Sequence, residues 1–119
     1  MPEQISQESN CVDYIEFGVS DIVRAKAFYG GVFGWTFTDY GEAYCEFTDD
    51  RFKGGFDLAS KPGRGGALVV LYHEDLEETV NKVLAAGGAI TKDIFQFPGG
   101  ERFQFTDTEG NELAVWRTR

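Results

Sequence analysis

The stretch YIEFGVSD (residues 14–21) decides the fold, because it joins a strand pattern directly to the start of a helix. Ile15, Phe17 and Val19 alternate with polar or small residues, which is typical of a strand with one buried face. Asp21 is a preferred N-cap residue, and an apolar stripe at helical spacing follows it until a glycine ends the pattern. The stretch therefore predicts a strand that leads into an amphipathic helix.

The same pattern returns half a chain later, in the stretch ALVVLYHED (residues 67–75). Its apolar run ends at an acidic cap, and the helical stripe that follows closes at Gly87-Gly88. Three further strand candidates follow each helix: Thr36–Tyr40, Ala43–Thr48 and Gly55–Ala59 in the first half, and Ile90–Phe95, Arg102–Thr106 and Leu113–Arg117 in the second. The chain therefore predicts two βαβββ modules in an α+β fold.

A length of 119 residues fits one domain with a sizeable core. We expect a tail over residues 1–11 and a single domain over 12–119, with modules at about 12–60 and 66–119 around a Gly- and Pro-containing linker. The tail lacks the basic and apolar regions of a secretion signal, which predicts a cytoplasmic protein. The longest apolar runs of the chain have the length of a strand, which is too short to span a membrane.

Charge and cysteine content narrow the partners further. The net charge of −9 repels phosphates and no basic run offsets it, so we expect no nucleic-acid partner. Cys11 and Cys45 are more simply explained as reduced thiols than as a disulfide, because the chain is rich in core residues. Cys45 alternates with polar neighbours, which predicts a small buried filler.

A set of short motifs spanning roughly Val12 to Trp116 carries a family resemblance. They are Asp21, Phe28-Tyr29, Val32-Phe33-Gly34-Trp35, Ala86-Gly87-Gly88, Asp107-Thr108-Glu109-Gly110-Asn111 and Val115-Trp116. Together they resemble the vicinal oxygen chelate superfamily, which includes glyoxalase I, extradiol dioxygenases and bleomycin-resistance proteins. Thr108 departs from the pattern, since the family usually has proline there. The resemblance implies a curved mixed sheet with the helices outside, and a homodimer.

Metal-dependent members of that superfamily bind a divalent ion in a cup formed by the sheet, with one His, Glu or Gln from each of four strands. Carried over onto this chain, these positions fall on Tyr14, on Phe56 or Asp57, on Ala67 and on Ala114. Alanine cannot bind a metal and neutral tyrosine is a poor ligand. The resemblance therefore predicts no metal and no cofactor, and the single histidine, His73, matches none of the four positions.

The same resemblance implies a candidate lining for the cup: Tyr14, Glu16, Phe56, Asp57, Ala67, Val69, Ala114 and Trp116. An apolar, aromatic lining suits a flat or hydrophobic small molecule. Glu16 is the candidate catalytic residue, because a carboxylate in such a site could accept a hydrogen bond or a proton. The alternatives are that Glu16 pairs with an arginine or a hydroxyl across the sheet, and that the small apolar residues merely fill it.

Three functions remain open at this point. The first is binding of a small aromatic or hydrophobic molecule without a metal. The second is a lyase or dioxygenase of the lactoylglutathione-lyase type with a rearranged metal site, so whether the protein is an enzyme stays open. The third is a drug-sequestering resistance protein, because a net charge of −9 would attract a cationic drug.

Overall fold

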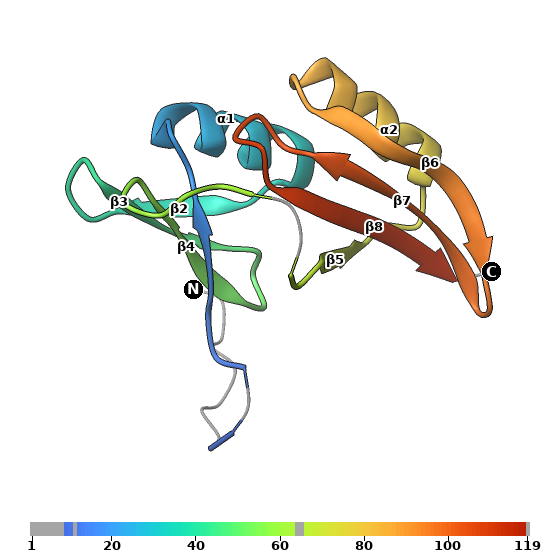
Figure 1. Ribbon diagram of the computed structural model, residues 1–119, viewed down its shortest axis with the longest axis horizontal. Helices are drawn as coiled ribbons and strands as arrows, with labels where there is room; N and C mark the ends of the chain where they lie inside the picture. Colours follow the sequence, from blue (N-terminus) through green and yellow to red (C-terminus); the bar gives the residue numbers. More distant parts are fainter. Residues whose placement is uncertain (1–8, 11, 64–65, 119) are drawn as a thin grey trace. The chain divides into compact units, whose positions relative to one another are not determined.

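The computed structural model describes residues 9–10, 12–63 and 66–118, and they form two compact units (Figure 1). One unit lies within residues 1–62 and the other within 63–119, so the division falls inside the stretch expected to be a linker. Most of the expected tail and Cys11 lie outside the described residues. No helix among the described residues is long and apolar enough to cross a membrane.

The first unit follows the expected βαβββ order. Its elements are β1 (Ile15–Gly18), α1 (Ile22–Phe33), β2 (Thr36–Asp39), β3 (Tyr44–Thr48) and β4 (Lys53–Asp57). The sheet order is β1-β4-β3-β2, with β1 parallel to β4 and the other pairs antiparallel. Asp21 caps α1 by accepting a hydrogen bond from the Arg24 amide at 3.0 Å, and Gly34 ends it at φ 74°.

The second unit repeats this topology (Figure 1). Its elements are β5 (Val69–Tyr72), α2 (Leu76–Ala85), β6 (Ala89–Phe97), β7 (Gly100–Thr106) and β8 (Glu112–Thr118). The sheet order is β5-β8-β7-β6, and β5 runs parallel to β8. Asp75 caps α2 through the Glu78 amide. The predicted α+β class and the repeated module are confirmed, in the form of two four-stranded mixed sheets with one helix each.

Stacked aromatic rings form the core of the first unit, between α1 and its sheet. The Tyr29 ring stacks on Trp35 with centroids 4.6 Å apart, and Trp35 stacks on Phe47 at 4.4 Å. Phe17 and Phe56 complete the cluster from β1 and β4. This cluster identifies the helix face of the first sheet, and alternation then assigns the side chains between these residues to the opposite, far face.

The second unit uses aliphatic and phenylalanine side chains for the same purpose. Leu76 and Val83 of α2 are fully buried, as are the sheet residues Phe103, Phe105 and Val115. Strand alternation then defines the far face of the second sheet. Its larger members on β5, β7 and β8 include Val70, Tyr72, Arg102, Gln104, Glu112, Ala114 and Trp116.

Two strand boundaries differ from the expected ones and matter for the site. β4 ends at Asp57, two residues early, because the Asp57 carboxylate accepts hydrogen bonds from the Ala59 amide and the Ser60 hydroxyl and so fixes a turn. β5 begins at Val69, so Ala67 precedes the strand. The remaining expected strands are present, with β6, β7 and β8 longer than predicted.

Cys45 lies on the helix face of β3 and is fully buried as a free thiol. Burial, with a smaller contribution from Asp39, raises the pKa of this thiol to about 11. The expectation that Cys45 fills a small space in the core is confirmed. The thiol is therefore protonated and shielded at neutral pH.

Candidate functional site

Two tyrosines and a glutamate form a hydrogen-bonded group on the far face of the first sheet. The hydroxyls of Tyr14 and Tyr44 lie 2.7 Å apart, and Tyr44 is also hydrogen-bonded to Glu16. A carboxylate can only accept, so Tyr44 donates to Glu16 and Tyr14 donates to Tyr44. Gly55 lies beneath this group, and a Cβ atom there would collide with the Tyr44 hydroxyl. The missing side chain of Gly55 therefore makes room for the pair of hydroxyls.

The surroundings keep both phenols protonated. Partial burial raises the pKa of Tyr14, and the charges of Glu46 and Glu16 raise it further. Burial and the hydrogen bonds to Tyr14 and Glu16 raise the pKa of Tyr44 well above its ordinary value. The structure therefore shows Glu16 paired with a hydroxyl across the sheet, one of the two pairings considered above for this carboxylate. A catalytic role for Glu16 stays a prediction.

Replacement of Tyr44 by phenylalanine should change how stability depends on pH. Because the folded protein raises the Tyr44 pKa, the unfolded chain loses this proton first, at about the ordinary value of 10.0. The stabilisation is present below that pH and is lost as the pH rises above it. Urea unfolding on either side of pH 10.0 should show a shallower loss in Tyr44→Phe than in wild type. Tyr40→Phe, at an exposed tyrosine, is the matched control, and parallel losses in Tyr44→Phe and wild type would contradict the prediction.

The other acidic candidates in the first unit have structural partners. The Asp57 carboxylate is occupied by the turn after β4, as described above. Glu46 lies 3.8 Å from the ammonium of Lys53, a weak and partly exposed ion pair. Neither carboxylate is arranged with Glu16 as a cation site. Asp57 is therefore better explained as a turn residue than as a ligand contact.

Phe56 does not lie where the candidate lining requires it. Its ring is fully buried on the helix face, 5.3 Å from the Tyr29 ring and 5.1 Å from Phe47. Its partner in the parallel register is Phe17, whereas Glu16 pairs with Gly55. Phe56 and Glu16 therefore lie on opposite faces of the same sheet. The prediction that both line one cup is wrong, because Phe56 belongs to the core.

The far face of the second sheet carries an aromatic platform, which consists of Tyr72, Phe97 and Trp116. The Trp116 ring contacts the edge of Tyr72 at 5.3 Å and lies 6.3 Å from Phe97. Tyr72 is 55% exposed, so its ring can be reached from solvent. Gly100 lies beneath, where a Cβ atom would come within 3.1 Å of Trp116 and 3.2 Å of Phe97.

Ala114 lies beside the platform, on the same face as Trp116, and its register partners are Val70 and Gln104. Val69 instead pairs with the buried core residue Leu113 and lies on the helix face. The prediction that Val69 lines the cup is therefore wrong, and Val70 is the residue on the face of Ala114. Ala67 is exposed and lies before β5, outside the platform.

Charged and polar side chains flank the platform on β6, β7 and β8. Glu112 accepts hydrogen bonds from the Thr91 hydroxyl at 2.6 Å and from the Gln104 amide at 3.3 Å. The Arg102 guanidinium lies over the Phe95 ring at 5.3 Å and over the Phe97 ring at 5.8 Å. The face therefore joins flat apolar surface to a positive charge.

The residues at the family's metal positions do not fit a metal ion. Ala114 offers no donor atom, and Ala67 offers none either. The Tyr14 hydroxyl is bonded to Tyr44 and its raised pKa opposes the phenolate that a metal would need. Over the ranges that the structure describes, no three His, Cys, Asp or Glu side chains are grouped to hold a metal.

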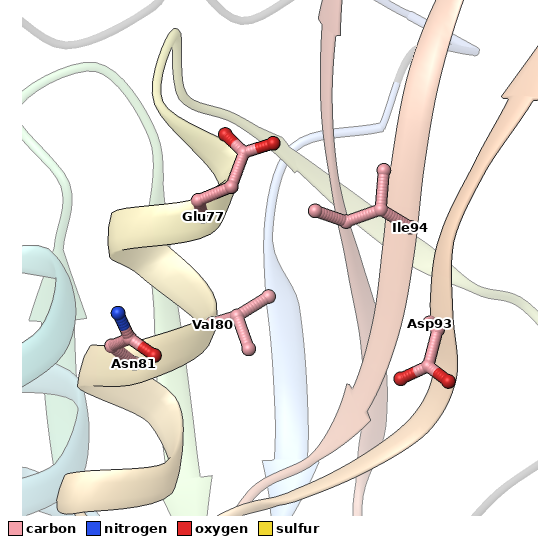
Figure 2. A pocket seen from close by; sticks show the side chains of 5 residues that line it. All are labelled: Glu77, Val80, Asn81, Asp93 and Ile94. Atoms are coloured by element: carbon pink, nitrogen blue, oxygen red, sulfur yellow. The ribbon is translucent and has the colours of Figure 1, made fainter.

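A shallow groove of about 400 Å³ lies between α2 and β6 (Figure 2). Glu77, Val80 and Asn81 line it from the helix, and Asp93 and Ile94 line it from the strand. The Glu77 carboxylate is held by Arg117 at 2.9 Å. The groove is lined by two carboxylates, one amide and two aliphatic side chains, and the Glu77 carboxylate is already paired with Arg117, so we assign the groove no chemistry.

Sequence reasoning missed Tyr44, Tyr72, Phe97 and Arg102. Alternation could have found the first two, because Tyr44 shares a period of two with Glu46, and Tyr72 shares one with Val70. Phe97 lies beyond the strand expected at residues 90–95, so no pattern placed it. Arg102 opened a predicted strand, yet its partner rings on β6 follow two register shifts that sequence does not reveal.

Comparison with known proteins gives a consistent picture. The family model described as Glyoxalase/Bleomycin resistance protein/Dioxygenase superfamily matches residues 12–115. A glyoxylase-like domain-containing protein from Didymella fabae is 29% identical over 119 residues, covering 85% of this chain and 88% of that protein. CFP32 of Mycobacterium tuberculosis is 23% identical over 128 residues, covering 98% of this chain but only 49% of that protein. The chain thus spans about half the length of the mycobacterial relative.

Solved structures share the fold at low identity. A glyoxalase/bleomycin resistance protein/dioxygenase family enzyme from Burkholderia phytofirmans superposes with a TM-score of 0.79 at 20% identity, over 91% of this chain and 100% of that one. The fosfomycin resistance protein FosX from Mesorhizobium loti gives 0.72 at 14% identity, over 95% of each chain.

Proposed function

The chain belongs to the Glyoxalase/Bleomycin resistance protein/Dioxygenase superfamily, and within that family we propose that it binds a small aromatic or hydrophobic molecule without a metal ion. The observation that carries the proposal is the aromatic platform on the far face of the second sheet, next to the position where metal-dependent relatives keep a ligand. Here that position is Ala114. An alanine at that position, with flat apolar surface beside it, supports binding without a metal.

Stacking is the interaction that such a surface offers. Aromatic rings provide a large contact area with few rotatable bonds, and they prefer edge or offset contacts with another ring. The exposed Tyr72 and the half-buried Trp116 already contact each other edge to face, so their arrangement is set before a ligand arrives. Preorganisation of this kind lowers the entropy cost of binding.

A thermal-shift screen of neutral planar compounds, with naphthamide as the first probe, tests the proposal on protein dialysed against a chelator. Binding to the folded state should raise the melting temperature, and above the Kd the rise should grow with the logarithm of probe concentration. A shift with this concentration dependence would support the proposal. The absence of any shift across the neutral aromatic set at millimolar concentration would contradict it.

The metal-dependent lyase is the second candidate, favoured by the family alone. We expect no turnover of the methylglyoxal–glutathione hemithioacetal, with or without added nickel or zinc, because relatives of that type need a metal to stabilise the enediolate. An absorbance assay beside an active glyoxalase measures this. Metal-dependent turnover that disappears in Glu16→Ala would reverse the ranking and make Glu16 a catalytic residue.

We also propose that the protein is a cytoplasmic homodimer. Both are expectations from the sequence, and the dimer is what the family resemblance implies. Light scattering on the full chain gives the molar mass directly, and a monomer at all concentrations would contradict the dimer.

A further inference from the structure

Arg102 has an unusual environment for a charged residue. It is half-buried on β7, between the platform residue Phe97 and the neighbouring ring of Phe95. Its Nε atom is buried and has no hydrogen-bond partner in the described part of the chain. A buried donor without a partner costs free energy, and a guanidinium normally satisfies its donors with a carboxylate.

A second cation lies at the same ring. The Lys92 ammonium is 5.6 Å from the centroid of Phe95, and Lys92 is exposed on β6. No ion pair joins Lys92 or Arg102 to a carboxylate among the ion pairs of the described residues. Glu112, the carboxylate on this face, is engaged by Thr91 and Gln104. In a chain of net charge −9, this is a local positive patch beside an aromatic surface.

We propose that the ligand of the platform is a planar aromatic acid, whose ring contacts Trp116 and Tyr72 and whose carboxylate pairs with the Arg102 guanidinium. This inference rests on the proposed function, because it uses the same platform. Guanidinium binds a carboxylate through two parallel donors, a geometry that the single ammonium of lysine does not offer. Lys92 adds long-range attraction at the rim. The patch also opposes capture of a cationic drug on this face.

Two matched probes separate the contribution of the ring to binding affinity from that of the negative charge. Naphthoate and naphthamide share a ring system, but only the former is an anion at neutral pH. Calorimetry on wild type should show naphthoate binding about tenfold or more tightly than naphthamide, since hydrogen bonds to charged groups are the stronger ones. Arg102→Gln should remove most of this preference, taken as the ratio of the naphthoate and naphthamide affinities measured in the same variant. Arg51→Gln removes the same charge from an exposed bend in the first unit and should keep the preference.

The remaining outcomes distinguish the two proposals. Equal affinity for both probes in wild type would overturn the proposal that the ligand is an acid, while leaving the platform as a binding site. A preference that survives in Arg102→Gln would also overturn it. Binding of neither probe would contradict the proposed function itself. Arg102→Lys, which keeps the charge but not the two parallel donors, guards against a misfolded glutamine variant and should retain part of the preference.

Discussion

Phe56→Ala is expected to lower the unfolding free energy of the first unit by about 3–5 kcal/mol, the usual cost of removing a buried phenylalanine. The ring is fully buried and contacts Tyr29 and Phe47, so its loss leaves a cavity that the stacked rings cannot easily fill. Urea unfolding followed by circular dichroism and by the fluorescence of Trp35, which stacks on Phe47 in the same core, measures the change.

The matched control is Tyr40→Ala, at a ring that is 59% exposed in the same unit. It should cost no more than about 0.5 kcal/mol, as is usual for a surface substitution. Naphthamide binding to the second unit should survive in both variants. A Phe56→Ala protein that keeps its stability and loses the probe would return Phe56 to the ligand lining.

Trp116→Ala is expected to weaken naphthamide binding about ten- to a hundredfold, which corresponds to about 1.4–2.8 kcal/mol. Trp116 is the centre of the platform, in contact with Tyr72 on one side and Phe97 on the other. Removing it takes away the largest contact area and also releases its two neighbours. Calorimetry on the purified variant gives the affinity directly.

Leu84→Ala controls for a general effect of removing an apolar side chain from the second unit. Leu84 belongs to α2 and is 52% exposed, so the substitution should leave probe affinity at the wild-type value. Unchanged affinity in Trp116→Ala would place the ligand elsewhere. The thermal stability of Trp116→Ala should stay close to wild type, because the ring is not in the core.

The fold was predictable because its signals are local. Asp21 and Asp75 act as the helix caps that the sequence indicated, and each is followed by the expected apolar stripe. The order βαβββ then follows from strands that alternate with turn residues, repeated once. Each of these features depends on neighbouring residues, so one sequence is enough to find it.

The site was less predictable because it depends on which face of a strand a residue occupies. Moving a position by one residue along a strand transfers its side chain to the other face. This accounts for Phe56, which the predicted lining named where the structure has Gly55 and its overlying tyrosines. It also accounts for Val69, because its neighbour Val70 is the residue that pairs with Ala114. Ala114 and Trp116 lie on one face of β8, and their part in ligand binding stays a prediction.

Metal-free binding of an aromatic molecule to the platform is the basis of the proposed function. Its most direct test is a calorimetric titration of naphthamide into wild-type protein that has been stripped by a chelator and confirmed metal-free by elemental analysis, repeated after addition of zinc. We expect the same affinity in both titrations, because Ala114 supplies no metal donor beside Trp116. Binding that appears only after zinc is added would contradict it.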